Sequence, residues 1–426
     1  MLQVSVLKEQ TDRVLAGLAK RNFPNAEAEV QRILSLDQRR RQLQTEHDSA
    51  QGEANKLAQQ IGGLMKSGDK AGAETLKVRT AELKQQTKAA AEELTQTEKE
   101  LQDALYRIPN VPHASVPAGR SADDNEVVRE VGQKPELPAD AQPHWELIKK
   151  LDIIDFELGN KITGAGFPVY KGQGARLQRA LINFFLEQAI DAGYTEIQPP
   201  ILINEASGYG TGQLPDKEGQ MYHATADDLY LIPTAEVPIT NLYRDEIIPT
   251  ERLPIRNAGY TPCFRREAGS WGAHVRGLNR LHQFDKVEIV QIAKPEDSYA
   301  ALDGMVAHIE GLLQQLGLPY RVLRLCGGDM GFTSALTYDL EVWSAAQQRW
   351  LEVSSASNFE TYQANRLKLR YRDENNKTQL LHTLNGSALA LPRIVAALME
   401  NNQQPDGTIK LPEVLHRYCG FQQLGQ

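Results

Sequence analysis

The N-terminal quarter of the chain carries apolar side chains at the spacing of long helices. Residues 1 to about 24 predict one short helix that ends near Asn22-Phe23-Pro24. From about Asn25 an apolar residue falls at every seventh position, which places these side chains on one helix face. A second run with the same spacing follows after residue 72. The two runs contain Leu36, Leu43, Ala50, Leu57 and Leu64, with Ala54 and Ile61 on a second seam, and then Leu76, Leu83, Ala90, Leu94, Leu101 and Ala104.

Residues 66–72, KSGDKAG, separate the two runs and predict a tight turn. Two heptad runs joined by such a turn predict an antiparallel helical hairpin. Arms of roughly 38 residues, at about 1.5 Å per residue, would reach roughly 55–60 Å, so we expect the hairpin to project. The periodicity leaves two functions open, a coiled coil that joins two subunits or an arm that contacts a large partner.

Basic residues near the turn mildly favour an arm that contacts a phosphate backbone. Such clusters are more often solvated helix faces, so this alternative stays open. The basic residues are Lys66, Lys70, Lys77, Arg79 and Lys84, against Asp69, Glu74 and Glu82, with a second cluster at Arg39, Arg40 and Arg41.

Prolines end the second helical run. Residues 107–112, RIPNVP, followed by Pro117 and Gly119, predict a linker. We therefore expect a helical N-terminal domain over 1–108, a linker over 109–126 and a second domain over 127–426. The second domain alternates a helix at 173–192 with β-rich stretches at 195–200, 337–343 and 350–355. This alternation predicts an α+β fold.

The stretch 259–292 predicts a β-hairpin that gathers chemically active side chains. Its first strand ends at Phe264, and a glycine-containing loop spans 269–277. The second strand alternates, with Val287 and Ile289 on one face and Glu288, Val290 and Ile292 on the other.

The hairpin brings together Arg265, Arg266, Glu267, Phe284 and Glu288. Arginine forks bind phosphate oxygens bidentately, and an aromatic face can stack on a base. These side chains therefore suit a phosphate-bearing planar ligand. The alternative is a solvated hairpin whose charges face water.

Two further polar groups adjoin predicted strands. Thr234-Ala235-Glu236 carries a hydroxyl and a carboxylate two residues apart, which could hold an ammonium; a threonine that caps a helix is the alternative. Glu352 and Ser355 fall at the end of the strand 350–355. Their oxygens suit a hard Mg²⁺ ion shared with substrate phosphates.

Composition narrows the class of protein. No apolar run reaches the roughly 18 residues of a membrane span, and the first residues lack a signal-peptide pattern. Three widely spaced cysteines, Cys263, Cys326 and Cys419, indicate a reducing cytoplasm. With no CxxC pair and no ligand spacing among the histidines, we expect no structural zinc. A net charge of −8 argues against indiscriminate nucleic-acid binding, although it allows a local basic patch.

Three motifs, in order, resemble those of class II aminoacyl-tRNA synthetases. Phe264-Arg265-x-Glu267 with His282-Gln283-Phe284 resembles the second signature motif. The helix 173–192 with the strand 195–200 resembles the first, and residues 382–393 resemble the third. The segments TPCFRREAGSWG and RLHQFDKVE follow a long predicted helical hairpin in the chain. Their sequences are similar to those of seryl-tRNA synthetases of the bacterial type. The resemblance is close over about 127–407.

The resemblance implies an antiparallel sheet flanked by helices, a homodimer and two reactions. ATP and L-serine give seryl-adenylate and pyrophosphate, and serine then passes to tRNA(Ser) with release of AMP. Whether tRNA(Sec) is also charged stays open.

The resemblance also implies roles for single residues. Arg265 and Glu267 act in catalysis, with Arg265 on the α-phosphate and the serine carboxylate and Glu267 on the adenine edge. Phe284 and Arg393 sandwich the adenine. The implied serine site is Thr234, Ala235, Glu236, Arg265, Glu288, Asn385 and Ser387; the implied ATP site is Arg265, Arg266, Glu267, Phe284, Glu352, Val353, Ser354, Ser355 and Arg393, with Glu352 and Ser355 on Mg²⁺.

Two other functions are weighed against this one. A synthetase paralogue that activates an amino acid for a non-tRNA carrier should lack the arm, which this chain has. A non-catalytic coiled-coil scaffold leaves the converging Arg, Glu and Phe side chains unexplained. The chain also departs from many relatives at Gly166, where an arginine is common, and at Pro392, where a glycine is common.

Overall fold

The computed structural model describes residues 1–137, 139–216, 218–268 and 276–425. The chain divides into two compact units. One comprises residues 1–19 and 23–109, and the other comprises residues 20–22 and 110–426.

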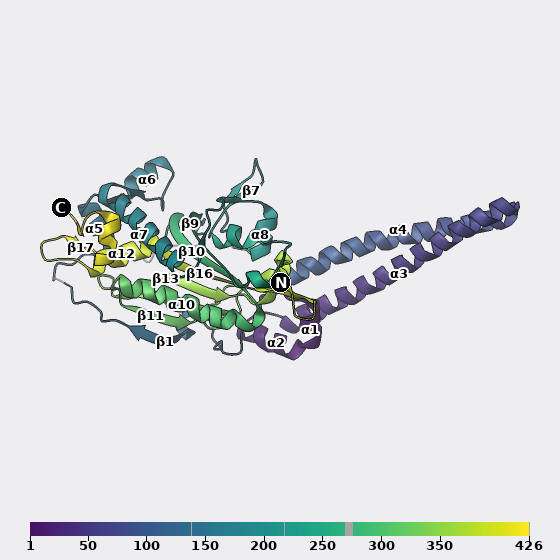
Figure 1. Ribbon diagram of the computed structural model, residues 1–426, viewed down its shortest axis with the longest axis horizontal. Helices are drawn as coiled ribbons and strands as arrows, with labels where there is room; N and C mark the ends of the chain where they lie inside the picture. Colours follow the sequence, from purple (N-terminus) through teal and green to yellow (C-terminus); the bar gives the residue numbers. More distant parts are fainter. Residues whose placement is uncertain (138, 217, 269–275, 426) are drawn as a thin grey trace. The chain divides into compact units, whose positions relative to one another are not determined.

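The first unit is helical, and Figure 1 shows its two long helices lying side by side. They are α3 (Ala26–Ser67) and α4 (Lys70–Arg107). Gly68 ends α3 in the left-handed conformation, and the Asp69 side chain caps α4 by accepting from the Gly72 N–H. The predicted antiparallel hairpin is therefore confirmed.

The predicted single helix before residue 24 is wrong, because two helices are present, α1 (Val4–Glu9) and α2 (Thr11–Lys20). Gln10 leaves the helical conformation, with φ −128° and ψ 35°. The Thr11 hydroxyl then donates to the Leu7 carbonyl at 2.8 Å. A side chain thus satisfies a carbonyl that the helix end leaves without a backbone donor.

The inner seam of the long helices contains the predicted apolar positions. Leu43, Ala54, Leu83 and Leu101 are buried between them. Two threonines, Thr80 and Thr97, are buried on the same seam, although the heptad analysis did not include them. The Thr80 hydroxyl donates to the Leu76 carbonyl at 2.7 Å, which allows a polar side chain to occupy an apolar seam.

In the described part of the second unit, eight strands form one sheet. They are β1 (Glu126–Val131), β4 (Thr195–Glu196), β9 (Ile255–Phe264), β10 (Gln283–Ala293), β11 (Tyr320–Arg324), β12 (Leu336–Ser344), β13 (Arg349–Asn358) and β16 (His382–Ala390). The strand order is β1-β11-β12-β13-β16-β10-β9-β4. Neighbours run antiparallel, except that β4 lies parallel to β9 at one edge. The predicted α+β fold with an antiparallel sheet is confirmed.

Helices cover both faces of this sheet (Figure 1). The helices α7 (Gly172–Asp191), α10 (Ser298–Gln315) and α12 (Leu391–Asn401) share the large core that includes Val287 and Ile289. On the other face, Val290 packs on α9 (Glu236–Asn241) and Ile292 packs on α11 (Thr361–Leu367). The predicted alternation along β10 thus separates a core face from a second face, which carries the candidate site.

The predicted strand 195–200 is shorter than expected, since only Thr195 and Glu196 pair with β9. Pro199 and Pro200 have no N–H to donate, so the strand cannot continue through them. The helix before it ends as predicted, with Gly193 in a left-handed conformation at φ 85°.

Shorter elements complete the second unit. They are α5 (His144–Lys150), α6 (Phe156–Ile162), α8 (Glu205–Thr211), α13 (Glu413–Cys419), β2 (Ile154–Asp155), β3 (Val169–Tyr170), β5 (Leu202–Ile203), β6 (His223–Ala224), β7 (Leu229–Leu231), β8 (Ile247–Ile248), β14 (Arg370–Arg372), β15 (Thr378–Leu380), β17 (Ile409–Lys410), β18 (Gln423–Leu424), and the 3₁₀ turns η1 (Ala122–Asp124), η2 (Thr250–Arg252), η4 (Gly277–Asn279) and η5 (Pro295–Asp297). Among the described helices, none is both long and apolar enough to cross a membrane.

Candidate functional site

A cavity of about 570 Å³ opens on the second face of the sheet. Its walls come from the hairpin β9–β10, the strands β13 and β16, the start of α12 and the segment after β7. Twelve of the residues that the sequence assigns to substrates line it, namely Thr234, Glu236, Arg265, Glu267, Phe284, Glu352, Val353, Ser354, Ser355, Asn385, Ser387 and Arg393.

Three other assigned residues do not line this cavity in the described part of the chain. Arg266 is exposed, and its backbone N–H donates to the Gln220 carbonyl at 2.9 Å. Ala235 is buried in the small cluster that packs α9 on Val290. Glu288 is fully buried behind the cavity wall.

Arg265 lies just past the end of β9, where backbone contacts fix its position. Its N–H donates to the His282 carbonyl at 2.9 Å, and its Nε donates to the Pro233 carbonyl at 3.4 Å. The guanidinium carbon lies 5.3 Å from the centre of the Phe284 ring. A cation and an aromatic face thus share one wall of the cavity, which suits a phosphate and a planar base.

Glu267 adopts a left-handed conformation, with φ 52°. This backbone is uncommon for a residue with a Cβ and turns the chain back toward the cavity. The Glu267 carboxylate forms an ion pair with Arg280, which also lines the cavity. Most of the predicted loop 269–277 lies outside the described residues.

Gly166, one of the two departures from the family pattern, lies against His282. Gly166 has φ +81°, and a Cβ at this position would lie 2.4 Å from Cδ2 of His282. The Phe167 ring stacks on the His282 ring, and the two ring centroids lie 5.3 Å apart. Since the His282 carbonyl accepts from Arg265, a larger residue at 166 would disturb the support of Arg265.

Glu236 is the principal buried carboxylate on the cavity wall. Its Oε1 accepts from Gln363 Nε2 at 2.7 Å, and its Oε2 accepts from Asn385 Nδ2 at 2.8 Å. Burial raises the pKa of Glu236 to about 7, and repulsion from Glu288 adds to this, against the opposing effects of Gln363, Lys286 and Asn385. A cationic ligand beside Glu236 would favour its ionised form.

Thr234 makes a contact like that of a helix-capping threonine, and its hydroxyl also contacts a buried carboxylate. Its Oγ1 accepts from the Glu236 N–H at 3.2 Å, a contact close to that of a capping threonine. The same hydroxyl donates to Glu288 Oε2 at 2.8 Å, which ties it to the carboxylate on β10.

Lys286 is a buried, cavity-lining residue that the sequence analysis missed. Its ammonium donates to Thr234 Oγ1 at 3.0 Å and forms an ion pair with Glu288. The alternation of residues along β10 would have predicted that Lys286 faces the cavity. Phe284, Lys286 and Glu288 are two residues apart and therefore share a face.

Ser387 and Asn385 enter the cavity from β16. Asn385 is fixed by its bond to Glu236, and the Ser387 carbonyl accepts from the Ser354 hydroxyl at 2.6 Å. Each assigned residue on β16 thus contacts another assigned residue across the cavity wall.

Glu352 and Ser355 lie on β13, and the prediction that they end this strand is wrong, because it continues to Asn358. Residues three apart on a regular strand face opposite sides. Here Leu340 pairs with Ser354 and Glu341 pairs with Glu352, so Val353 is one extra residue. This bulge turns Glu352 and Ser355 to the same face.

The bulged corner has oxygen donors that fit Mg²⁺. Ser355 donates to the Asp339 carboxylate, and Asp339 Oδ1 is buried without a hydrogen-bond partner among the described residues. Burial, with repulsion from Glu352, raises the pKa of Asp339 well above its ordinary value. No group of three or more His, Cys, Asp or Glu side chains in the described ranges could hold a metal alone. An ion here would therefore need ligand oxygens from a phosphate.

Arg393 projects into the cavity from the first turn of α12, where Pro392 has no N–H that would need an acceptor. Its Nε donates to the Asn279 carbonyl at 3.0 Å, and its Nη1 donates to the Glu352 carbonyl at 2.7 Å. These contacts hold the guanidinium plane between η4 and β13.

The basic clusters of the helical unit are partly neutralised. Arg39 pairs with Glu93 at 2.6 Å and Arg79 pairs with Glu53 at 3.3 Å, so both link α3 to α4. Of the five basic residues that the sequence predicts near the turn, all of them described, Lys66, Lys70 and Lys84 form no ion pair.

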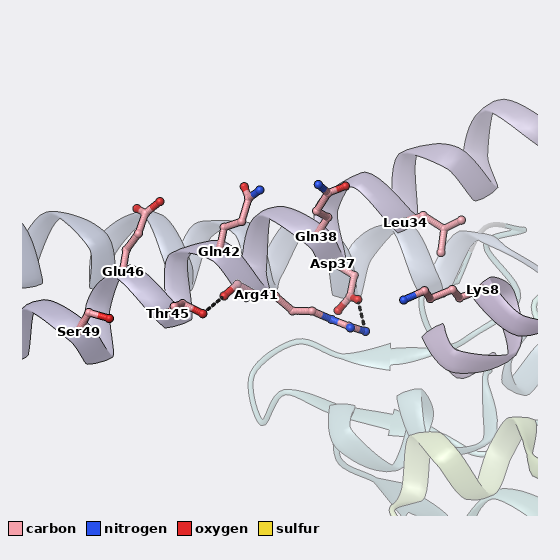
Figure 2. Close-up of a pocket in the computed structure, with 9 residues that line it drawn as sticks. All are labelled: Lys8, Leu34, Asp37, Gln38, Arg41, Gln42, Thr45, Glu46 and Ser49. Carbon is pink, nitrogen blue, oxygen red and sulfur yellow. Dashed lines mark hydrogen bonds and ion pairs between the residues drawn. The ribbon is translucent and has the colours of Figure 1, made fainter.

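A hollow of about 740 Å³ lies on one face of α3 beside Lys8 (Figure 2). Arg41 within it pairs with Asp37 at 2.7 Å, and Glu46 pairs with Arg39 at 3.7 Å, which leaves Lys8 as one further cation of the lining. Its charges therefore give it no particular affinity for phosphate. It is lined by Lys8, Leu34, Asp37, Gln38, Arg41, Gln42, Thr45, Glu46 and Ser49.

Comparisons with known proteins agree with this architecture. Residues 1–112 match the family model of the seryl-tRNA synthetase N-terminal domain, and residues 221–402 match that of the class II tRNA synthetase core domain for G, H, P, S and T. The chain is 52% identical to the serine–tRNA ligase of Salinibacter ruber, over 100% of this chain and 99% of that protein. It is 47% identical to the serine–tRNA ligase of Chlorobium phaeovibrioides, over 100% and 99%. The structure of seryl-tRNA synthetase from Pyrococcus horikoshii complexed with ATP superposes with a TM-score of 0.92 at 33% identity, covering 100% of this chain and 99% of that one.

Proposed function

The chain belongs to the seryl-tRNA synthetase family, and from this membership we propose that it joins L-serine to tRNA(Ser) in two steps. ATP and serine first give seryl-adenylate, and the seryl group then passes to the tRNA. The observation that carries this proposal is the cavity itself. It combines Arg265 beside an aromatic face with Glu236, a buried carboxylate suited to an ammonium.

In the first step, a carboxylate oxygen of serine attacks the α-phosphorus of ATP. The new O–P bond forms as the bond from the α-phosphorus to the bridging oxygen breaks, and pyrophosphate leaves with that electron pair. No protein nucleophile is needed, so the side chains act by positioning and by charge. Arg265 is placed to neutralise charge on the α-phosphate and on the attacking carboxylate.

The adenine is assigned to the space between Phe284 and Arg393, with Glu267 at its edge. The position of Arg265 near Phe284, and the anchoring of Arg393 to two carbonyls, support this assignment. The relative from Pyrococcus horikoshii is complexed with ATP, which supports ATP as the nucleotide.

Glu352 and Ser355 would hold a Mg²⁺ ion together with phosphate oxygens. Bound there, the ion would supply positive charge against the phosphate oxygens. In this corner the chain itself contributes the bulge at Val353, which presents both oxygens on one face, and the Asp339 carboxylate, which accepts from Ser355.

Serine is assigned to the part of the cavity around Thr234, Glu236, Asn385 and Ser387. A site that bonds the serine hydroxyl would discriminate against alanine, which would leave a buried polar group unpaired. Ala235 and Glu288 belong to this pocket through the segments that carry them, since both are buried next to its wall.

The partners of the enzyme follow from the family and from the helical unit. We infer that the hairpin α3–α4 contacts tRNA through its unpaired lysines, and that two copies form a homodimer through α7 and the residues after it. Three buried cysteines without disulfides fit a reducing cytoplasm. Charging of tRNA(Sec) is a further outcome to be measured where that tRNA exists.

ATP–pyrophosphate exchange, assayed with each of the twenty amino acids, tests the first step. We expect exchange with serine alone, followed by serylation of tRNA(Ser). Exchange with serine but no transfer to any tRNA would favour the carrier-protein paralogue instead. No exchange with any amino acid would refute the proposed function.

A further inference from the structure

Three ionisable side chains meet in the pocket assigned to serine, and each is at most 5% exposed. They are Glu236, Lys286 and Glu288. With both carboxylates ionised, their charges sum to minus one, which is the charge that an α-ammonium would balance. Buried charges are costly unless they are paired, so Lys286 is the internal counter-ion of this pocket.

The hydroxyl of Thr234 has no remaining capacity for a ligand in this arrangement. It accepts from Lys286 Nζ at 3.0 Å and from the Glu236 N–H at 3.2 Å, and it donates its proton to Glu288 Oε2 at 2.8 Å. A hydroxyl has one donor and two acceptor positions, and all three are in use. The Lys286 ammonium therefore occupies a position that a substrate ammonium would need in order to reach Thr234.

Lys286 and Thr234 together hold one oxygen of Glu288 and leave the other without a partner. Lys286 pairs with Oε2, whereas Oε1 is buried and accepts no hydrogen bond from the described residues. An orphaned buried acceptor on an anion is unfavourable unless a ligand completes it. Because Glu288 lies behind the cavity wall, the balance of its charge depends on Lys286 and Thr234.

We propose that Lys286 is a positioning residue for the amino-acid substrate. The Lys286 ammonium holds Glu288 directly and through Thr234, so that Glu236 is the buried carboxylate that the cavity presents to a cationic amine. This inference rests on the proposed function and adds to it a residue with no assigned role. Lys286 lines the cavity, whereas Glu288 behind it does not. Lys286 therefore separates the charge of Glu288 from a substrate in the cavity.

The charged groups that face Glu236 are Glu288 and Lys286, both on β10, while α11 and β16 present the neutral amides of Gln363 and Asn385. Arg265, just past the end of β9, is a further cation of the cavity lining. Removal of Lys286 would take away the cation that lowers the pKa of Glu236 and leave the repulsion from Glu288, so the pKa of Glu236 would rise above about 7.

Lys286→Met tests this proposal, because methionine keeps the unbranched stem of the side chain up to the ε position and removes its charge. In ATP–pyrophosphate exchange at about pH 7.5, we expect the serine KM to rise roughly tenfold to hundredfold, while the ATP KM stays within about twofold. We also expect the pH range over which the serine KM falls to move to higher pH than in the wild type. For Lys286→Ala, a small alkylammonium ion should restore part of the serine affinity, and a neutral alcohol of the same size should not.

Lys410→Met, on the exposed strand β17, is the matched control and should keep both KM values. If Lys286→Met does not fold, Lys286→Gln retains a hydrogen-bond donor without the charge and should show the same shift with pH. The proposal is overturned if a folded variant keeps the wild-type serine KM and pH profile, or if the serine and ATP KM values rise together. Wild-type protein without serine-dependent exchange would instead refute the proposed function.

Discussion

Arg393 donates from Nη1 to the backbone carbonyl of Glu352 at 2.7 Å, so a side chain at the start of α12 is fixed to the strand that carries the proposed Mg²⁺ ligands. A second bond, from Nε to the Asn279 carbonyl at 3.0 Å, sets the plane of the guanidinium. Only arginine can make both contacts with one rigid planar group.

Arg393→Lys should therefore raise the ATP KM while it leaves the charge of the cavity unchanged. We expect a rise of roughly tenfold, since one or both charged hydrogen bonds are lost. The serine KM should change much less, because serine is assigned to another part of the cavity. Exchange kinetics with each substrate varied in turn would check this, and an equal rise in both KM values would contradict it.

Arg265→Ala should abolish adenylate formation without unfolding the protein. The guanidinium faces the cavity, and its loss removes a cation where charge develops at phosphorus, so the exchange rate should fall by roughly 10³ or more. Arg372→Ala, which changes an exposed arginine on β14, should leave exchange intact. Retained exchange in Arg265→Ala, with an unchanged thermal transition, would show that Arg265 has been assigned wrongly.

The serine KM of the wild type should fall as pH rises through about 7. Burial raises the pKa of Glu236 to about 7 from its ordinary range, so the carboxylate is mostly protonated below that pH and mostly ionised above it. An α-ammonium binds the ionised form more strongly. Glu236→Gln should bind serine weakly at every pH and lose this dependence. A flat wild-type profile between about pH 6 and 8 would contradict this assignment.

Glu352→Gln should increase the Mg²⁺ concentration needed for exchange. The substitution keeps the shape of the side chain but replaces an anionic oxygen, so half-saturating Mg²⁺ should rise roughly tenfold. Titration with Mn²⁺ in the presence of ATP, followed by electron paramagnetic resonance, would measure binding independently of the rate. Glu341→Gln, on the neighbouring strand and outside the cavity lining, is the control. Equal Mg²⁺ requirements in both variants would count against the proposed metal site.

Replacement of about residues 28–104 by a short flexible linker should leave serine-dependent exchange intact and reduce transfer to tRNA. We expect transfer to fall by roughly 10² or more, because the phosphate contacts of the hairpin are lost. The triple change of Lys66, Lys70 and Lys84 to serine keeps the length of the hairpin and removes three positive charges near its turn, so it should reduce transfer as well. Normal transfer after the deletion would mean that the hairpin is structural.

Period-seven and period-two patterns predicted the elements in which one face must be apolar. The hairpin α3–α4 and the two faces of β10 were predictable because burial fixes each of these residues individually. The break at Gln10 was not, since it depends on the Thr11 hydroxyl replacing a backbone donor. Thr80 was also missed, because its bond to the Leu76 carbonyl hides a polar group inside an apolar seam.

The candidate site was predictable where adjacent residues along the chain act together, as in Arg265 and Glu267. It was not predictable where the decisive relation joins distant segments. The bond between Gln363 and Glu236, and the occupation of Thr234 by Lys286, depend on how α9, α11 and β10 pack. The collision that a side chain at 166 would make with His282 is likewise visible only in the folded protein.

The extra residue Val353 also affects which mutations at this position the protein can tolerate. The residue adds nothing chemical to the corner between β12 and β13, yet its presence decides which way Ser355 points. Deletion of Val353 would leave every other assigned residue in the protein, yet it would remove the bulge and turn Glu352 and Ser355 to opposite faces of the strand. Substitutions at Val353 should therefore be tolerated far more often than deletions, so that selection at this position acts on the number of residues more than on their identity.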